Sequence, residues 1–170
     1  MYKTNIPSKL SREEFISIFG SVYEHSPWIA AQLYDAGIEQ TFNNCQSLHV
    51  AMKTIVDNAD RKQKLKLLNS HPDLAGKLAV NEVLTPSSAF EQTGAGLNNC
   101  SQDEFDEFQK LNKKYKAKFG FPFILSVSGY QRKEILEIFR ERVNNEKTIE
   151  FAEALEQVHC IALFRLEDIE

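Results

Sequence analysis

The sequence of 170 residues predicts an all-α fold: a single-domain bundle of about seven or eight helices spanning residues 1–170. A chain of this length is commonly one domain. Apolar residues recur at steps of three and four along most of the chain, as on one face of an amphipathic helix. Several of these stretches are preceded by Ser-x-x-Glu, a sequence typical of helix N-termini. One short apolar run, residues 121–129, could form a strand, but the chain offers no second run to pair with it.

The first two helices are predicted from their start signals. Ser11-x-x-Glu14 forms a capping box ahead of an apolar stripe, and Pro27 suits the first position of the second helix. His25 and Trp28 lie at the corner between these helices. We expect both side chains to be packed and hydrogen-bonded there.

Two further helices are expected at about 44–58 and 60–70. His49 lies within the first of them beside apolar neighbours, which favours a structural role. The second is expected to end at His71, because a residue that precedes proline avoids the helical region of backbone space.

The C-terminal half contains the clearest helix of the chain. It opens with Ser101-x-x-Glu104 and carries an apolar stripe as far as a glycine that ends it. Two more helices are expected at about 130–144 and 148–167. Arg165 lies near the end of the last one, where a surface cation would interact favourably with the helix dipole.

Composition excludes several classes of protein. The net charge of −4, with both signs interspersed, argues against a nucleic-acid-binding protein. No apolar run is long enough to span a membrane, and no secretory signal is visible at the N-terminus. The three cysteines are far apart and form no zinc or disulfide pattern, as in a protein of a reducing compartment. We therefore expect a cytoplasmic protein.

The residues with the most chemistry gather between His71 and Leu97. His71 follows a helix and precedes a proline, so its imidazole is expected to face a cleft. Ser88-x-x-Glu91 reads as a second capping box, and Gln92 follows it. These side chains could perform acid–base chemistry, and they carry no metal or phosphate signature. The alternative is that His71 only marks a helix end and Ser88 only caps the next helix.

The apolar run 121–129 is expected to be an extended connection that crosses the core. It is too short for a helix and contains a proline near its start. Backbone groups in such a segment need hydrogen-bond partners, and a polar ligand could supply some of them.

Taken together, these residues resemble the OHCU decarboxylase family, where OHCU is 2-oxo-4-hydroxy-4-carboxy-5-ureidoimidazoline. Members of that family form (S)-allantoin after urate oxidation in purine catabolism. The matching blocks are Val22–Ala30, His71–Ala75, Ser88–Leu97, Phe119–Ile124 and, more weakly, Ile161–Leu166. They follow the family's order over nearly the whole chain. The sequence departs from the family's pattern at Ser128, where many members carry a basic residue.

The resemblance implies an all-α fold, no cofactor, no metal and a small-molecule substrate, OHCU, with a homodimer as the common assembly. It implies His71 as the essential acid–base residue, with Glu91 beside it. The residues implied to bind substrate are Pro72, Ser88, Gln92, the main chain of Phe123, Ile124, Leu125, Ser126 and Val127, and Arg165.

The chemistry agrees with these residue types. Loss of carbon dioxide sends electrons into the neighbouring C=N unit of the substrate, so the substrate is its own electron sink. The protein has to deliver one proton to one face of a ring carbon, a task suited to histidine at neutral pH. Two alternatives remain: a hydrolase of a related ureido compound, and a non-catalytic helical binding module. The four histidines lack HxH or HExxH spacing, which counts against a metal-dependent hydrolase.

Overall fold

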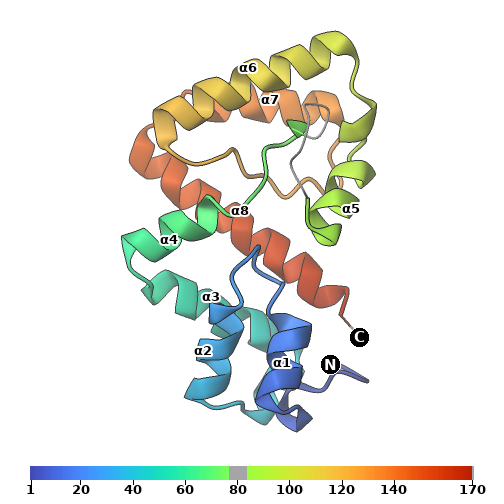
Figure 1. Cartoon of the computed structure of the whole chain (residues 1–170), viewed down its shortest axis with the longest axis vertical. Coiled ribbons are helices and arrows are strands. Elements are labelled where there is room, and N and C mark those ends of the chain that lie inside the picture. Colours follow the sequence, from blue (N-terminus) through green and yellow to red (C-terminus); the bar gives the residue numbers. More distant parts are fainter. Residues whose placement is uncertain (77–83, 170) are drawn as a thin grey trace. The chain divides into compact units, whose positions relative to one another are not determined.

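The computed structural model describes residues 1–76 and 84–169 (Figure 1). Within these residues the chain forms eight α-helices and no strand, which confirms the all-α prediction. The α-helices are α1 (Arg12–Phe19), α2 (Trp28–Ala36), α3 (Cys45–Asn58), α4 (Arg61–Leu68), α5 (Pro86–Gly94), α6 (Gln102–Phe119), α7 (Arg132–Arg142) and α8 (Lys147–Glu167). The described residues also form three short 3-10 turns: η1 (Pro7–Lys9), η2 (Gln40–Asn43) and η4 (Leu97–Asn99).

The chain divides into two compact units. Unit 1 comprises Met1–Ser70 and Val158–Glu170, and unit 2 comprises His71–Gln157. The boundary in the last helix lies within α8. The prediction that the chain works as a single domain stays a prediction.

In unit 1, α1 packs against α2 and α2 against α3. The capping box at Ser11 is present: Glu14 N–H donates to the Ser11 side chain, and the Glu14 carboxylate accepts from the Ser11 backbone. Pro27 is the N-cap of α2 and not its first helical residue, so the helix begins at Trp28, one residue later than predicted. His25 is exposed, with a positive φ of 46°, so the prediction that it is packed was wrong. His49 is half-buried and its Nε2 lies 2.9 Å from the carbonyl oxygen of His159, which fits a structural role.

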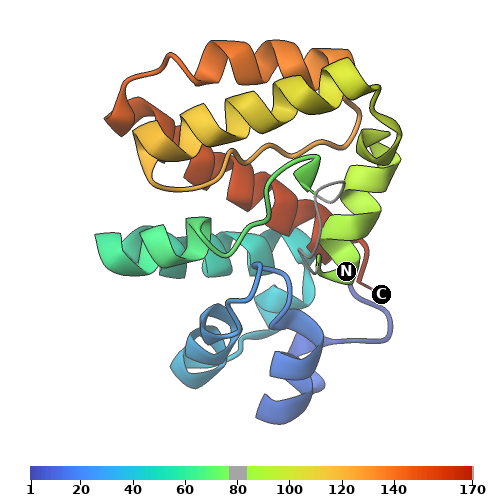
Figure 2. The same cartoon turned by 45° about the horizontal axis from the view of Figure 1, so that its top comes forward.

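Unit 2 is built around α6 and α7, which lie side by side in both cartoon views (Figures 1 and 2). The capping box predicted at Ser101 is present, and Gly120 ends α6 in the left-handed conformation. Tyr115 of α6 lies at the centre of an aromatic cluster whose rings also come from α7 and from the segment after α6. These rings are Phe119, Phe121, Phe123 and Phe139. The cluster fixes that segment against both helices.

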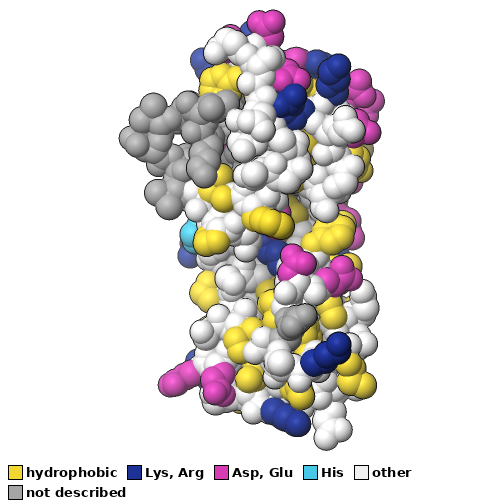
Figure 3. Space-filling view, turned by 90° about the vertical axis from the view of Figure 1, so that its right-hand side faces the viewer, with side chains coloured by type: hydrophobic (Ala, Val, Ile, Leu, Met, Phe, Trp, Pro, Cys, Tyr) yellow, Lys and Arg dark blue, Asp and Glu magenta, His cyan; other side chains and the backbone are white. Residues whose placement is uncertain are grey.

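On the face shown in Figure 3, acidic and basic side chains are intermixed among apolar and neutral ones. None of the helices in the described ranges combines the length and the apolar character required to cross a membrane.

Candidate active site

The loop His71–Gly76, called the His71 loop below, follows α4. That helix ends at Leu68, two residues before the predicted end at about residue 70, and one further turn leads into the loop. His71 is buried, with 8% of its surface exposed, so its imidazole is withdrawn from bulk water. Ala75 has a φ of +55°, in the left-handed region that residues other than glycine rarely occupy. Such a conformation costs roughly 1–3 kcal/mol and persists only where surrounding contacts hold it.

Helix α5 begins earlier than the sequence predicted. Thr85 is its N-cap and accepts the Ser88 N–H at 3.3 Å, and Pro86 occupies the first helical position. The predicted capping box at Ser88-x-x-Glu91 was therefore wrong, because the Thr-Pro pair is the stronger start signal. Ser88 is therefore not the cap of α5: it is buried and lies inside the first turn of the helix.

Ser88, Glu91 and Gln92 lie on one face of α5. Glu91 and Gln92 follow Ser88 by three and four residues, so each of the two lies beside Ser88 on the helix surface. Ser88 and Gln92 are buried and Glu91 is half-buried. The structure thus brings these three predicted site residues together on one helix.

Gln92 joins α5 to the His71 loop. Its Oε1 accepts the Ala75 N–H at 3.1 Å, and its Nε2 donates to the carbonyl oxygen of Asp73 at 3.4 Å. One side chain therefore fixes two backbone groups on either side of Leu74. This pair of bonds contributes to holding Ala75 in its left-handed conformation.

Helix α6 contacts the same loop through three polar side chains. The Gln109 and Asn112 amides donate to the carbonyl oxygens of the loop, and the Lys116 ammonium donates to the Asp73 carboxylate. None of these three residues was predicted from the sequence to contact the loop. A polar asparagine inside the apolar stripe of α6 is the signal that could have revealed the contact.

The segment Phe121–Val127, on the other side of α6 in the sequence, is also irregular, as predicted. Arg142 Nη1 donates to the carbonyl oxygen of Ile124 at 2.8 Å, and the Ser126 N–H donates to Gln157 Oε1 at 3.0 Å. Two of its backbone groups thus have protein partners. Phe123, Ile124, Leu125 and Val127 are buried and Ser126 is half-buried.

A buried ionic network holds Arg142 in place. Its Nη2 lies 2.6 Å from Glu150 Oε1, and Glu150 is fully buried. Tyr115 also donates to Glu150, and Asn145 donates to its second oxygen at 2.7 Å. Burial, followed by the hydrogen bond to Glu150, raises the pKa of Tyr115 well above its ordinary value. Sequence reasoning missed this network because its members come from three separate helical regions.

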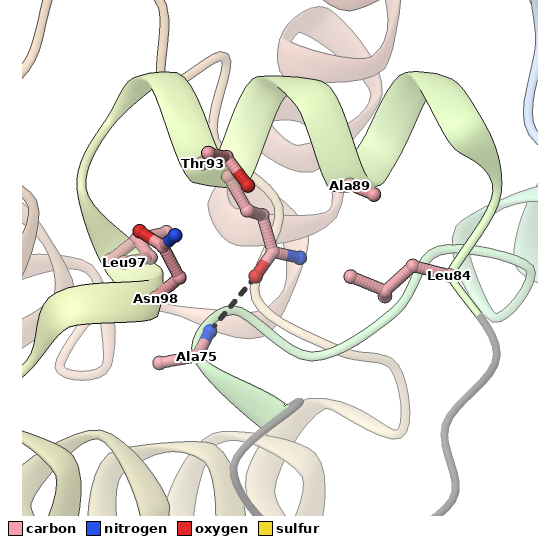
Figure 4. Close-up of a pocket in the computed structure, with 7 residues that line it drawn as sticks. Ala75, Leu84, Ala89, Thr93, Leu97 and Asn98 are labelled. Carbon is pink, nitrogen blue, oxygen red and sulfur yellow. Dashed lines mark hydrogen bonds between the residues drawn. The ribbon is translucent and has the colours of Figure 1, made fainter.

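A cavity of about 290 Å³ opens between α5, η4 and the His71 loop (Figure 4). It is lined by Ala75, Leu84, Ala89, Gln92, Thr93, Leu97 and Asn98. The dashed line in Figure 4 marks the hydrogen bond that the Ala75 N–H donates to Gln92 Oε1. Of the predicted site residues, Gln92 lines this cavity, whereas His71, Ser88 and Glu91 are not among its lining residues. Its size suits a small polar molecule.

Arg165 belongs to unit 1. Its Nη1 donates to Glu24 Oε2 at 2.7 Å, and both side chains are buried. The interpretation of Arg165 as a surface cation was therefore wrong. Its predicted role in binding substrate stays a prediction.

Within residues 1–76 and 84–169, no group of three His, Cys, Asp or Glu side chains could hold a metal ion.

These features define a class of protein. It is an all-α protein in which a strained loop carries a buried histidine. Two helices fix that loop, and a small cavity with a polar amide lies beside it. This arrangement suits the binding of a small polar molecule close to the loop that carries the histidine.

The comparisons with known proteins agree with this class. The sequence model of one family, described as OHCU decarboxylase, matches residues 8–167. The chain is 36% identical over 161 residues to the 2-oxo-4-hydroxy-4-carboxy-5-ureidoimidazoline decarboxylase of Haloferax volcanii, covering 95% of this chain and 92% of that protein. It is 40% identical to the uric acid degradation bifunctional protein of a Bacillus species, covering 95% of this chain but 31% of that protein. The chain thus spans about a third of the length of that bifunctional relative.

Solved structures give the same result. The crystal structure of (S)-allantoin synthase matches with a TM-score of 0.74 and 33% identity, covering 94% of this chain and 51% of that one. The crystal structure of OHCU decarboxylase in the presence of (S)-allantoin matches with a TM-score of 0.67 and 25% identity, covering 92% and 96%. The chain belongs to the OHCU decarboxylase family.

Proposed function

We propose that this protein is a carboxy-lyase that decarboxylates OHCU to (S)-allantoin in urate degradation. The observation that carries the proposal is the buried His71 on a loop fixed by α5, in a chain whose family match runs from residue 8 to residue 167. The near-complete coverage of the Haloferax volcanii decarboxylase supports the same activity.

The reaction needs few groups from the protein. The bond between C4 and the carboxylate breaks and carbon dioxide leaves. The electron pair forms a C4=C5 double bond, and the former C5=N pair moves to nitrogen, which takes a proton. The enol then gains a proton at C5 and loses the hydroxyl proton, giving the C4 carbonyl of allantoin. Because the substrate accepts the electrons itself, we propose that no cofactor and no metal take part.

In this scheme His71 delivers the proton to one face of C5, which sets the configuration of the product. A positioned acid or base contributes about 10²–10⁴-fold to a rate. We assign to Glu91 the orientation of the C4 hydroxyl or acceptance of its proton. The location of Glu91 on the same face of α5 as Ser88 and Gln92 supports this assignment.

We propose that Ser88, Gln92 and Pro72 bind the substrate beside His71. Gln92 already bonds two backbone groups of the loop. Its amide has a second N–H and a second lone pair on oxygen, so it can hold the loop and a substrate carbonyl together. Its presence in the cavity wall supports this dual role.

We propose further that the main chain of Phe123, Ile124, Leu125, Ser126 and Val127 binds substrate, and that Arg165 does so as well. The Ser126 N–H is already used by Gln157, so another backbone group of the segment must make the contact. Substitution of Arg165 by Lys tests its part: a raised KM is expected, and an unchanged KM would remove Arg165 from the site.

We also propose that residues 1–170 act as one domain in a cytoplasmic homodimer. The unbroken family match across both units supports one domain. The three cysteines, all within the described ranges, form no disulfide, as is usual in reducing compartments. Sedimentation velocity of the full chain tests the dimer: a species of about twice the chain mass is expected, and a monomer at micromolar concentration would contradict it.

The activity is tested by adding the purified protein to freshly generated OHCU while following optical rotation and release of labelled carbon dioxide. We expect optically active (S)-allantoin and carbon dioxide to appear together, faster than in the spontaneous reaction, which gives racemic product. A hydrolase would consume OHCU without releasing carbon dioxide, and a binding module would leave the spontaneous rate unchanged. Either result would overturn the proposal.

A further inference from the structure

Helix α6 contacts the His71 loop in a regular pattern. Gln109, Asn112 and Lys116 share one face of α6, at steps of three and four residues. They bond to three consecutive loop residues in the opposite order. Gln109 Nε2 donates to the Ala75 oxygen at 3.4 Å, Asn112 Nδ2 to the Leu74 oxygen at 2.9 Å, and Lys116 Nζ to Asp73 Oδ2 at 2.5 Å.

Asn112 is the buried centre of this pattern. Only 2% of its surface is exposed, and it lies in the apolar stripe between Phe108 and Tyr115, which are both fully buried. Its Oδ1 has no hydrogen-bond partner among the described residues. A buried amide that is only half satisfied is unfavourable for folding compared with an apolar side chain of similar size. Packing alone therefore does not explain an asparagine here.

The contact that Asn112 does make falls where the loop needs support. Gln92 of α5 fixes the Asp73 oxygen and the Ala75 nitrogen, on either side of Leu74. Asn112 fixes the Leu74 oxygen between them from α6. Because Ala75 is held in a left-handed conformation, loss of this central bond would allow the loop to relax. His71, three residues before Leu74, would move with it.

We propose that Asn112 is a positioning residue for the reaction, one that sets the place of the His71 imidazole through the Leu74 carbonyl. The inference rests on the proposed function. Asn112 acts through the loop and does not itself need to touch the substrate. A misplacement of a catalytic group by about 1 Å can lower a rate by about 10²-fold.

The test compares Asn112→Leu and Asn112→Asp with the wild-type chain. Lys113→Ala, at an exposed neighbour on α6, is the matched control. For Asn112→Leu we expect kcat to fall by about 10²-fold with a smaller change in KM, while the thermal midpoint stays near the wild-type value. We also expect the enantiomeric excess of the allantoin to fall. A purely structural role would reduce only the folded fraction and leave the enantiomeric excess unchanged.

Asn112→Asp gives a second readout. A carboxylate cannot donate to the Leu74 oxygen, but the protonated acid can. Burial favours the protonated form, so the ratio of variant to wild-type kcat is expected to rise as the pH is lowered. A ratio that stays as low as that of Asn112→Leu at every pH would contradict the proposal.

A measurement without substrate separates this inference from the proposed function. The imidazole resonances of His71 in ¹H–¹⁵N NMR spectra are expected to shift in Asn112→Leu and to stay in place in Lys113→Ala. If the wild-type chain does not act on OHCU but these resonances shift, the proposed function fails and the positioning role of Asn112 stands. If Asn112→Leu keeps the wild-type kcat, enantiomeric excess and His71 resonances, the inference is overturned.

Discussion

Two irregular segments of unit 2 carry predicted site residues, and they are held in different ways. The loop His71–Gly76 is held mainly by neutral amides from α5 and α6 and contains a strained residue, Ala75. The segment Phe121–Val127 is held by a buried ion pair and by aromatic packing. The ring of Phe123 stacks on Phe139, with centroids 3.8 Å apart, and Arg142 lies 4.7 Å above the Phe123 centroid.

The two kinds of support differ in how strongly they affect the stability of the fold. Neutral hydrogen bonds are each worth about 0.5–1.5 kcal/mol, so the His71 loop can be adjusted without loss of the fold. A buried charge left without its partner is far more destabilising, so the second segment is coupled to the stability of the unit. We therefore expect changes at the first segment to affect activity more than stability, and changes at the second to do the reverse.

The largest expected effect on stability is that of Glu150→Ala. It leaves the Arg142 guanidinium buried without its carboxylate, and loss of one partner of a buried pair costs about 3–5 kcal/mol. Urea unfolding measures this, with Glu141→Ala, at an exposed position on α7, as the control. The double variant Arg142→Met with Glu150→Leu should recover most of the loss. A destabilisation below about 1 kcal/mol in the single variant would show that the network does not hold the segment.

Gln92→Leu is expected to have the next largest effect on stability and a larger one on activity. It leaves the Ala75 N–H and the Asp73 carbonyl without their partner, and each unsatisfied buried group costs about 1–3 kcal/mol. Gln92→Glu keeps the acceptor for Ala75 and loses the donor to Asp73, so it should be milder. Equal kinetics for the wild-type chain and Gln92→Leu would show that α5 does not fix the loop.

Tyr115 makes the second segment sensitive to alkali. Its pKa is raised in the folded state, so above about pH 10 the unfolded chain loses the phenol proton first and stability falls as the pH rises. One tyrosine contributes at most about 1.4 kcal/mol per pH unit to this slope. Burial also raises the pKa of Tyr2, in unit 1. Tyr115→Phe should therefore remove part of the slope between pH 10 and 11 in urea titrations, and an unchanged slope would count against the raised pKa.

Lys116→Ala is expected to have the smallest effect. The lysine is 46% exposed, and ion pairs at exposed positions contribute about 0–1 kcal/mol. We expect a change of less than about 1 kcal/mol in unfolding free energy and a modest fall in kcat. Because salt screens the ion pair, the difference in kcat between the variant and the wild-type chain should be smaller in high salt. A loss of activity as large as that of Asn112→Leu would show that the ion pair between Asp73 and Lys116 holds the loop as much as the neutral amides do.

The sequence predicted the fold well because local signals decide it. Apolar periodicity located the helices, and the capping boxes at Ser11 and Ser101 marked two starts correctly. Ser88 was misread as a cap because Thr85-Pro86, three residues earlier, competes for the same role and wins. Helix boundaries depend on such small differences between neighbouring signals.

The contacts of the site were harder to predict because they join residues far apart in sequence. Asn112 bonds to Leu74 across 38 positions, and Arg142 reaches back 18 positions to Ile124. Buried polar groups of this kind break the apolar pattern of a helix, as Asn112 does in α6, but the pattern does not reveal their partners. His71 and Gln92 were found from local sequence, whereas the groups that hold them required the structure.

The most direct test of the account is the rate of formation of optically active allantoin by the wild-type chain and by His71→Gln, at equal folded fraction and with fresh OHCU. We expect rapid formation of (S)-allantoin by the wild-type chain and only slow, racemic product with the variant, at the spontaneous rate. Wild-type speed and optical purity in His71→Gln would contradict it, because the loop would then hold a histidine that the reaction does not use.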